Sequence, residues 1–396
     1  MSVTAPGGFE AGGVACGIKA TGAPDLAMVA TTDRLPVAAA GVFTTNRVQA
    51  APVRVSAEHL ADGRAAAVVL NSGNANAATG EQGRRDARRM CELTAESLGC
   101  SPADVLVCST GLIGVPLPMQ PVEAGIPKLA ASLGAHGDLA AEAILTTDTR
   151  AKEATDAFEL ADGTVAHVGA MAKGAAMLAP ALATMLSVIT TDLAMPADVL
   201  RSALSYAVDD SFHLLSIDGS TSTNDTVLAL AGGAAGNAPI VADTPDYELV
   251  KQAIRRVCKV LTNEMALDAE GATKLVDILV TGARTVGEAR VAARQVANSQ
   301  LVQCSLNGGD PYWGRVLSEL GVSGASFDPE AVDISYGDVS VCRGGVAADH
   351  DEAKLAAVMA GERIVITCDL HAGDGTADVT TTDLSHAYID ENRRTS

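Results

Sequence analysis

The stretch KGAAMLAPALATMLSVITTD runs from Lys173 to Asp192 and joins two different patterns. Its first part, Lys173 to Pro180, is rich in Gly and Ala and ends in Pro, which predicts a flexible segment. Its last part, Met185 to Thr191, is a short apolar run that predicts a buried strand. A helix is predicted next, over Ala197 to Asp209. A flexible approach therefore meets a buried strand at Ala183-Thr184.

The residues before this stretch alternate short apolar runs with turn residues. Gly, Pro, Asp and Asn bound the runs, which is typical of buried strands. Predicted strands cover Leu26–Thr31, Ala38–Phe43, Ala65–Leu70, Val105–Cys108 and Thr164–Met171, and predicted helices cover Arg84–Leu98, Pro127–Leu133 and Gly137–Leu145. Short strands and helices mixed in this way indicate an α+β fold or a layered α/β sandwich.

The residues after the stretch suggest a division of the chain. Residues 231–246 are rich in Gly, Ala and Pro and form the best linker candidate, and a helix is predicted over Tyr247 to Met265. The pattern then changes to strand, helix and a mixed tail. With 396 residues the chain is long enough for two or three domains. We therefore expect a main domain over residues 1–280 and a smaller C-terminal α+β domain over residues 281–396.

The composition favours a large core made of small side chains. Hydrophobic residues make up 48% of the chain but aromatic residues only 3%, so Ala, Val, Leu and Ile must fill the interior. This composition suits close packing of helices on sheets and argues against disorder.

The net charge of −20 bears on the kind of partner. A field of that sign repels nucleic acid and anionic membrane surfaces, although a locally basic pocket could still take an anionic substrate. The start of the chain has no basic region followed by an apolar run, and no eighteen consecutive residues are apolar. We expect a cytoplasmic protein that acts on small molecules, without a nucleic acid or membrane partner.

The eight cysteines are scattered and form no C-x-x-C pair. Reduced, buried thiols are the expected state, and neither a disulfide framework nor a zinc site is predicted.

Hydroxyl side chains cluster at predicted strand ends, but the sequence shows no obvious base for them. Thr146-Thr147-Asp148-Thr149 is one such run, and any single run could simply cap a helix or fill a turn. The seven histidines are dispersed and the chain has no G-x-S-x-G motif. A Ser-His-Asp triad is not excluded, since triads are spatial, but nothing points to one.

A threonine offers another route to a nucleophile. If the peptide bond before it breaks, its own α-amine becomes the base for its hydroxyl. The ordinary pKa of that amine is about 7.7–8.0, so a substantial neutral fraction exists near neutral pH. Such a threonine should follow a small residue and begin a buried strand, as Thr184 follows Ala183. Many strand starts meet this description, so these residues alone leave Thr184 one candidate among several.

A set of motifs in fixed order resembles the ornithine acetyltransferase/glutamate N-acetyltransferase family, and the stretch from Lys173 resembles its self-processing site. The other segments are NSGNANAATG from Asn71, STGLIG from Ser109, TTDT from Thr146, SIDGSTSTND from Ser216, DAEGATK from Asp268 and NGGDPYWGR from Asn307. The match spans essentially the whole chain. An ordered set of this length is far more specific than any one short motif.

The resemblance implies the fold shared with self-processing β-aminopeptidases and cleavage between Ala183 and Thr184, giving an α chain, 1–183, and a β chain, 184–396. Thr184 would take the acetyl group of N-acetylornithine as an ester and pass it to glutamate, which means ping-pong kinetics. An α2β2 assembly is implied, and no metal or organic cofactor is needed. Acetyl-CoA would be a second donor, for making N-acetylglutamate, if the enzyme is bifunctional.

The resemblance also implies the roles of individual residues. Thr110 and Gly111 would form the oxyanion hole, where a hydroxyl and a backbone N–H suit a tetrahedral oxyanion. Lys173 would pair with the carboxylate that both substrates carry, and Glu270 with the ammonium group of ornithine. The substrate-binding set is Thr146, Lys173, Thr184, Glu270, Asn392 and Ser396. The tail departs from the family pattern, because Ser396 follows Asn392 by four positions rather than five, and Thr395 is the alternative.

Two other functions remain open at this point. A self-processing aminopeptidase or amidase would use the same fold and nucleophile, with water in place of the amine acceptor. A binding or scaffold protein would never cleave itself.

Overall fold

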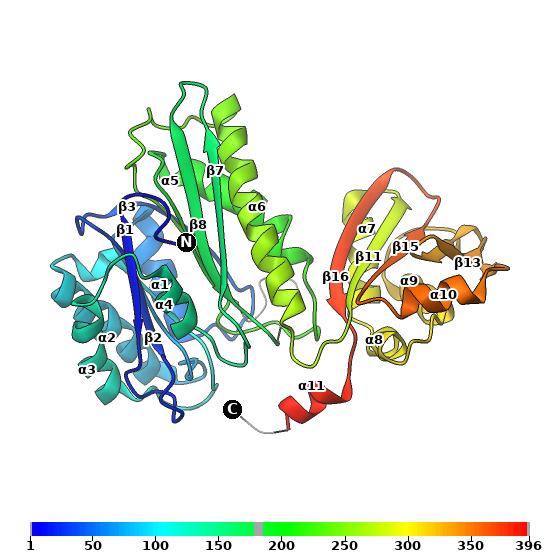
Figure 1. Ribbon diagram of the computed structural model, residues 1–396, viewed down its shortest axis with the longest axis horizontal. Coiled ribbons are helices and arrows are strands. Elements are labelled where there is room, and N and C mark those ends of the chain that lie inside the picture. The colour runs from blue at the N-terminus through cyan, green and yellow to red at the C-terminus, as the bar shows by residue number, and fades with distance from the viewer. Residues whose placement is uncertain (1, 178–184, 394–396) are drawn as a thin grey trace.

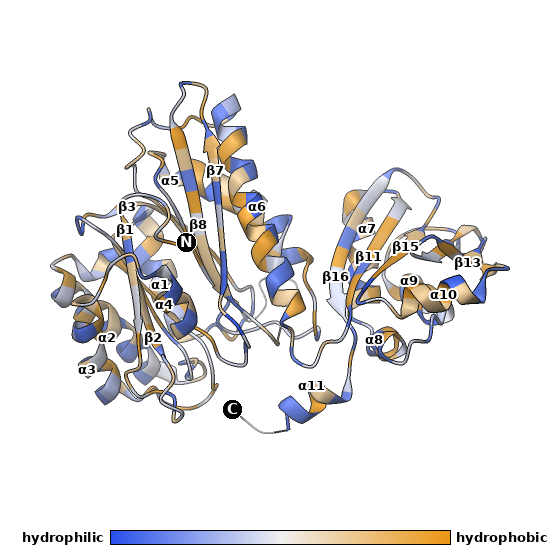
Figure 2. Ribbon diagram, in the orientation of Figure 1, coloured by the Kyte–Doolittle hydropathy of each residue, from blue (hydrophilic) through white to orange (hydrophobic). Residues whose placement is uncertain are grey.

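Extended runs of small apolar residues build three β-sheets in residues 2–177 and 185–393, the part of the chain that the computed structural model describes. Figure 1 shows the first two sheets with helices around them, and the third sheet standing apart with helices of its own. Hydrophobic residues concentrate on strands such as β8 and β11 and on the sides of the helices that cover them (Figure 2).

The first sheet has the strand order β1-β2-β5-β6. Its strands β5 and β6 are parallel, and the other neighbours are antiparallel. The strands are β1 (Phe9–Val14), β2 (Leu26–Thr31), β5 (Ala67–Asn71) and β6 (Val105–Ser109), and the helices nearby are α1 (Ala51–His59), α2 (Gly80–Leu98), α3 (Met119–Ala130) and α4 (Gly137–Ala143). Helix α2 connects β5 to β6, so the three form a βαβ unit.

The second sheet has the order β4-β3-β10-β9-β8-β7, in which only β9 and β10 are parallel. Its strands are β3 (Val37–Phe43), β4 (Arg64–Ala65), β7 (Lys152–Glu159), β8 (Val165–Lys173), β9 (Leu186–Thr191) and β10 (Thr226–Ala231), and its helices are α5 (Ala197–Asp209) and α6 (Pro245–Leu267). Strand β8, which precedes residues 178–184, and strand β9, which follows them, are neighbours in this sheet.

Side chains on one face of each sheet pack between the two sheets, and side chains on the other faces pack on helices. The result is four layers. Ala27 and Val29 of β2 pack with Leu186 and Val188 of β9 between the sheets. The intervening β2 residues face α2 and α3 instead, and the other face of the second sheet packs on α5 and α6. The order is helices, sheet, sheet, helices, which confirms the predicted layered α+β architecture.

The third sheet has the order β14-β13-β12-β15-β11-β16 and a hydrophobic core of its own. Its strands are β11 (Leu275–Ala283), β12 (Asp333–Tyr336), β13 (Val339–Arg343), β14 (Val346–Ala347), β15 (Arg363–Asp369) and β16 (Gly375–Thr382), with helices α7 (Val286–Ala297), α8 (Gln300–Asn307), α9 (Trp313–Val322), α10 (Glu352–Met359) and α11 (His386–Glu391). The predicted boundary at residue 281 falls inside β11; the division into two domains stays a prediction.

Several predicted bounds match the structure, but two helices begin a turn or more before their predicted starts, and the one predicted from Arg84 begins at Gly80. Strand β2 and helix α5 have the predicted ends. The helix predicted from Pro127 begins at Met119 instead. Pro127 lies inside this helix and not in its first turn, where proline is normally tolerated, so it did not mark the helix start.

All eight cysteines are free thiols, in line with the prediction that they are reduced. Burial raises the pKa of the Cys108 and Cys258 thiols to about 12, so both stay protonated at neutral pH. Cys304 is exposed, and the prediction of burial is wrong for it. No helix within residues 2–177 and 185–393 is long and apolar enough to cross a membrane.

Candidate active site

The ends of several elements surround one small cavity of about 220 Å³. The end of β6, the loop after α4, the end of β8, and helix α11 with the residue that follows it all reach this cavity. Its lining residues are Thr110, Gly111, Thr146, Thr147, Lys173, Ala176, Met177, Asp218, Ser220, Glu270, Tyr388 and Asn392. Six of the predicted site residues are therefore brought together: Thr110, Gly111, Thr146, Lys173, Glu270 and Asn392. Ala183, Thr184, Thr395 and Ser396 lie outside the described residues.

Thr110 follows directly on strand β6, and Asn71 at the end of β5 holds the turn. The carbonyl of Asn71 accepts the Thr110 N–H at 3.0 Å, and the Asn71 side chain accepts the Ser109 hydroxyl at 2.6 Å. The hydroxyl of Thr110 is buried and has no hydrogen-bond partner in the described part of the chain. A buried polar group without a hydrogen-bond partner lowers the stability of the fold. The presence of this hydroxyl is therefore explained by function and not by folding.

The backbone around position 111 leaves room for glycine alone. The φ of Gly111, +129°, lies where L side chains are strained, and a Cβ atom there would lie 2.4 Å from the carbonyl carbon of Gly73. It would also lie 2.5 Å from the nitrogen of Asn74. Only glycine lets the chain after Thr110 pass this close to the 73–74 backbone.

Lys173 ends strand β8 with its side chain almost fully buried, 2% exposed. Its ammonium group donates to the Thr146 hydroxyl at 2.6 Å and pairs with Asp148 at 3.3 Å. A buried cation is costly unless it is paired and hydrogen-bonded, and both conditions hold here. The lysine is therefore a built part of the cavity and not a surface residue.

A chain of alternating charges extends behind Lys173. Asp148 also pairs with Lys152 at 2.7 Å and accepts the Gly174 N–H at 2.7 Å, and Lys152 pairs with Asp268 at 2.5 Å. Burial alone would raise the pKa of Asp148, but Lys173 and Lys152 outweigh it and hold that pKa well below its usual range. The two lysines and two aspartates compensate one another.

Glu270 lies against the C-terminal helix. Its carboxylate accepts the side-chain N–H of Asn392 at 2.6 Å. The next residue, Gly271, has a φ of +64°, and a Cβ atom there would lie 2.2 Å from the Tyr388 nitrogen. Helix α11 therefore packs directly on the backbone beside Glu270. The Tyr388 hydroxyl donates to Asp218 at 3.2 Å, so residues from the chain's C-terminal part close one side of the cavity.

Asp225 fixes the backbone directly before strand β9 by a hydrogen bond. It is fully buried, and its Oδ1 accepts the backbone N–H of Met185 at 3.0 Å. Its Oδ2 has no hydrogen-bond partner in the described residues, and burial raises the pKa of the carboxyl well above its usual range. The neighbouring Asn224 donates to the carbonyls of Ser109 and Ala75 at 2.8 and 2.6 Å, which ties this loop to Thr110.

Sequence reasoning missed several residues of this site. Asp148, Asp218, Ser220 and Asp268 all lie inside the motifs that were recognised, so position within a motif was an available signal. Lys152 and Tyr388 lie outside those motifs, and only the folded structure brings them to the site.

Fold and cavity together define a class: a layered α+β enzyme with a small polar site, walled by a buried cation, carboxylates and a free hydroxyl donor. Such a site suits a substrate of amino-acid size that carries charges of both signs.

Comparison with known proteins gives the family. The model of the ArgJ family matches residues 10–395. Over 390 residues the chain is 50% identical to the arginine biosynthesis bifunctional protein ArgJ of Symbiobacterium thermophilum, covering 98% of this chain and 96% of the relative. It is 46% identical to the protein of that name from Thermobifida fusca, covering 99% of each. The chain belongs to the ArgJ family, which confirms the predicted family and an enzyme of arginine biosynthesis.

A solved structure is also similar. The ornithine acetyltransferase of Mycobacterium tuberculosis, complexed with ornithine, is 42% identical over 47% of this chain and 96% of that chain, with a TM-score of 0.41.

Proposed function

We propose that this enzyme transfers the acetyl group of N-acetylornithine to glutamate through an acetyl ester on Thr184. In the first half-reaction the Thr184 hydroxyl attacks the acetyl carbonyl, its α-amine accepts the hydroxyl proton, and the α-nitrogen of ornithine leaves with a proton. In the second, the amine of glutamate attacks the ester and Thr184 regains its proton. The two amines never need to occupy the site together, so the kinetics are ping-pong.

The observation that carries this proposal is the unpartnered hydroxyl of Thr110 in the wall of the cavity. A donor that is already buried and unpaired pays no cost to turn toward an oxyanion, and its bond forms only as charge develops. The N–H of Gly111 is the second donor in this proposal. Loss of one such donor raises the barrier by about 2.7–4 kcal/mol.

Lys173 and Glu270 support recognition of an amino acid. The ammonium group of Lys173 lines the cavity and suits the α-carboxylate that ornithine and glutamate share. Glu270 and Asn392, hydrogen-bonded to each other at 2.6 Å, offer an acceptor for the side-chain ammonium of ornithine. With Thr146 they make up the part of the predicted binding set that the cavity contains; Ser396 stays a prediction.

Self-cleavage between Ala183 and Thr184 belongs to the same proposal, as do the α chain 1–183, the β chain 184–396 and an α2β2 assembly in the cytoplasm. The hydrogen bond from Met185 to Asp225 supports it, because it fixes the residue directly after Thr184 at the start of β9, an interior strand of a buried sheet. We also propose that the reaction needs no metal or organic cofactor, and that acetyl-CoA is a second donor.

Mass spectrometry of the purified protein, with transfer assays, tests the proposal. We expect two chains that meet at Ala183–Thr184, with at most one ornithine released per active site without glutamate and continuous release of ornithine from N-acetylornithine only when glutamate is present. Thr184→Ala should give one full-length chain without activity, whereas Thr184→Ser keeps a hydroxyl and is the matched control for processing. Normal cleavage of Thr184→Ala would remove Thr184 as the processing residue. Hydrolysis of amides without transfer would favour an aminopeptidase or amidase.

A further inference from the structure

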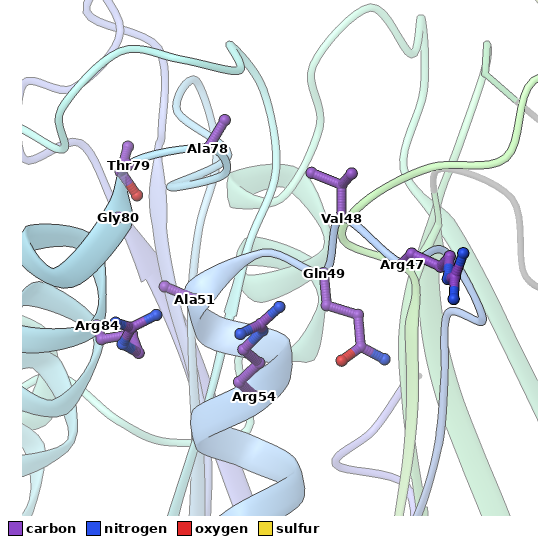
Figure 3. Close-up of a pocket in the computed structure, with 9 residues that line it drawn as sticks. All are labelled: Arg47, Val48, Gln49, Ala51, Arg54, Ala78, Thr79, Gly80 and Arg84. Carbon is purple, nitrogen blue, oxygen red and sulfur yellow. The ribbon is translucent and has the colours of Figure 1, made fainter.

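A second cavity, of about 280 Å³, lies between the starts of helices α1 and α2 (Figure 3). Three arginines line it: Arg47 from the loop before α1, Arg54 from α1 and Arg84 from α2. No acidic residue is among its lining residues, although the chain carries 48 Asp and Glu against 28 Lys and Arg. A cavity whose charged lining residues are all cationic, in so acidic a protein, favours a specific anion over a merely solvated surface.

The arginines are largely free to bind a ligand. The guanidinium groups of Arg47 and Arg54 have neither a hydrogen bond nor an ion pair within residues 2–177 and 185–393. Arg84 pairs with Glu81, which lies outside the lining. Figure 3 shows Arg54 and Arg84 facing each other from α1 and α2. Like charges held across a cavity repel, and an anion between them relieves the repulsion.

The backbone around this cavity also favours an anion. Helices α1 and α2 both begin at it, and neither has a side chain capping its first turn. The positive ends of two helix dipoles therefore add to the arginines. The loop that enters α2 is rigid: Asn76 donates to the Gly83 carbonyl at 2.9 Å and accepts the Thr79 hydroxyl at 2.7 Å.

This cavity and the candidate active site share one end of the same βαβ unit. Strands β5 and β6 are parallel, with Asn71 paired to Ser109, so Thr110 and the start of α2 both follow their carboxyl ends. Ligands of open α/β sheets bind at this end. Asn74 forms a bridge to Thr110, and Ala78, four residues later, lines the arginine cavity. Four residues span at most about 14 Å.

A second connection runs through another loop. Ser220 lines the active-site cavity, and the next carbonyl, that of Thr221, accepts the side-chain N–H of Asn46 at 3.0 Å. Arg47 follows directly. The two cavities are therefore within reach of a single ligand that carries an acyl group at one end of a flexible arm and anionic groups at the other.

We propose that the arginine cavity binds the phosphate groups of a nucleotide-bearing acetyl thioester, acetyl-CoA, whose acetyl group is delivered to Thr184. The inference rests on the proposed function, because it needs that nucleophile. The thioester C–S bond breaks, the acetyl carbon bonds to the Thr184 oxygen, and the hydroxyl proton goes through the α-amine to the departing thiolate. Transfer to glutamate then follows as with the other donor.

Donor-dependent kinetics of an Arg47→Ala/Arg54→Ala double variant test the inference. Neither guanidinium group has a hydrogen bond or ion pair in the described structure, so the change breaks no such interaction there. We expect the KM for acetyl-CoA to rise about tenfold or more, with kcat nearly unchanged, because charge-assisted bonds to phosphate are lost. The KM values for N-acetylornithine and for S-acetylpantetheine, a thioester without phosphate, should stay unchanged. The double variant Arg201→Ala/Arg343→Ala removes two exposed arginines, of α5 and β13, and controls for the loss of two positive charges.

The outcomes separate this inference from the proposed function. An unchanged KM for acetyl-CoA, an equal rise for the phosphate-free thioester, or a wild-type enzyme that does not use acetyl-CoA at all would overturn the phosphate site. Each of these results leaves transfer from N-acetylornithine intact. Loss of that transfer in the wild-type protein would instead refute the proposed function.

Discussion

Two buried carboxyl groups of this protein, Asp148 and Asp225, have opposite electrostatic surroundings. Asp148 contacts the ammonium groups of Lys152 and Lys173 at 2.7 and 3.3 Å. Asp225 accepts the N–H of Met185, and its second oxygen has no partner among the described residues. Burial raises the pKa of both groups, but the lysines reverse the effect for Asp148 alone.

The difference explains how the wall of the cavity can hold a lysine that is both buried and charged. A cation as buried as Lys173 needs a carboxylate that stays ionised, and Asp148 stays ionised because a second lysine stabilises it from behind. Asp225 has no paired lysine at contact distance in the described residues, and burial raises its pKa, which favours the neutral carboxyl. It supports the backbone of β9 without adding negative charge beside Thr110. Three substitutions test these roles in the protein.

Asp148→Asn should have the largest effect on stability. It leaves the buried ammonium groups of Lys152 and Lys173 without their shared carboxylate, which typically costs about 3–5 kcal/mol in the free energy of unfolding. Urea unfolding at pH 7 measures this loss. The lowered pKa of Asp148 also means that its contribution is present above the unfolded-state pKa of about 3.9 and is lost as pH falls through the folded pKa. A variant as stable as wild type would show that the charge network is not needed.

Thr110→Val should lower activity while leaving stability nearly unchanged. The hydroxyl has no partner to lose in the described structure, and valine has almost the same shape. We expect kcat for acetyl transfer to fall about 10²–10³-fold, as for other single oxyanion donors. Paired kinetic and unfolding measurements check both parts. Equal losses of activity and stability would mean that the threonine has a structural role.

Asp225→Asn should have the smallest effect at neutral pH and a distinctive pH dependence. The folded-state pKa of Asp225 is raised, so its contribution is fully present below the unfolded-state pKa of about 3.9 and is lost as pH rises through the folded value. An asparagine does not titrate. The variant should therefore gain stability relative to wild type as pH rises, in urea unfolding between pH 4 and 9. Parallel stability curves would show that Asp225 is not neutral in the folded protein.

The sequence by itself determined the layered α+β class, many strand and helix positions, and six residues of one cavity. It could do so because apolar periodicity and turn residues act locally, and because the family's motifs are contiguous. Strand β2 and helix α5 show the local part, and Thr110, Lys173 and Glu270 show the motif part. The roles assigned to Thr184 and Ser396 stay predictions.

The tertiary structure alone decided which charges compensate one another. Lys152 and Asp268 are 116 residues apart and pair at 2.5 Å, and Tyr388 reaches Asp218 across 170 residues. No local pattern encodes such pairs, because they depend on how β7, α6 and α11 come together. The same holds for the isolation of Asp225: a carboxyl is charged or neutral according to the groups that the fold places around it.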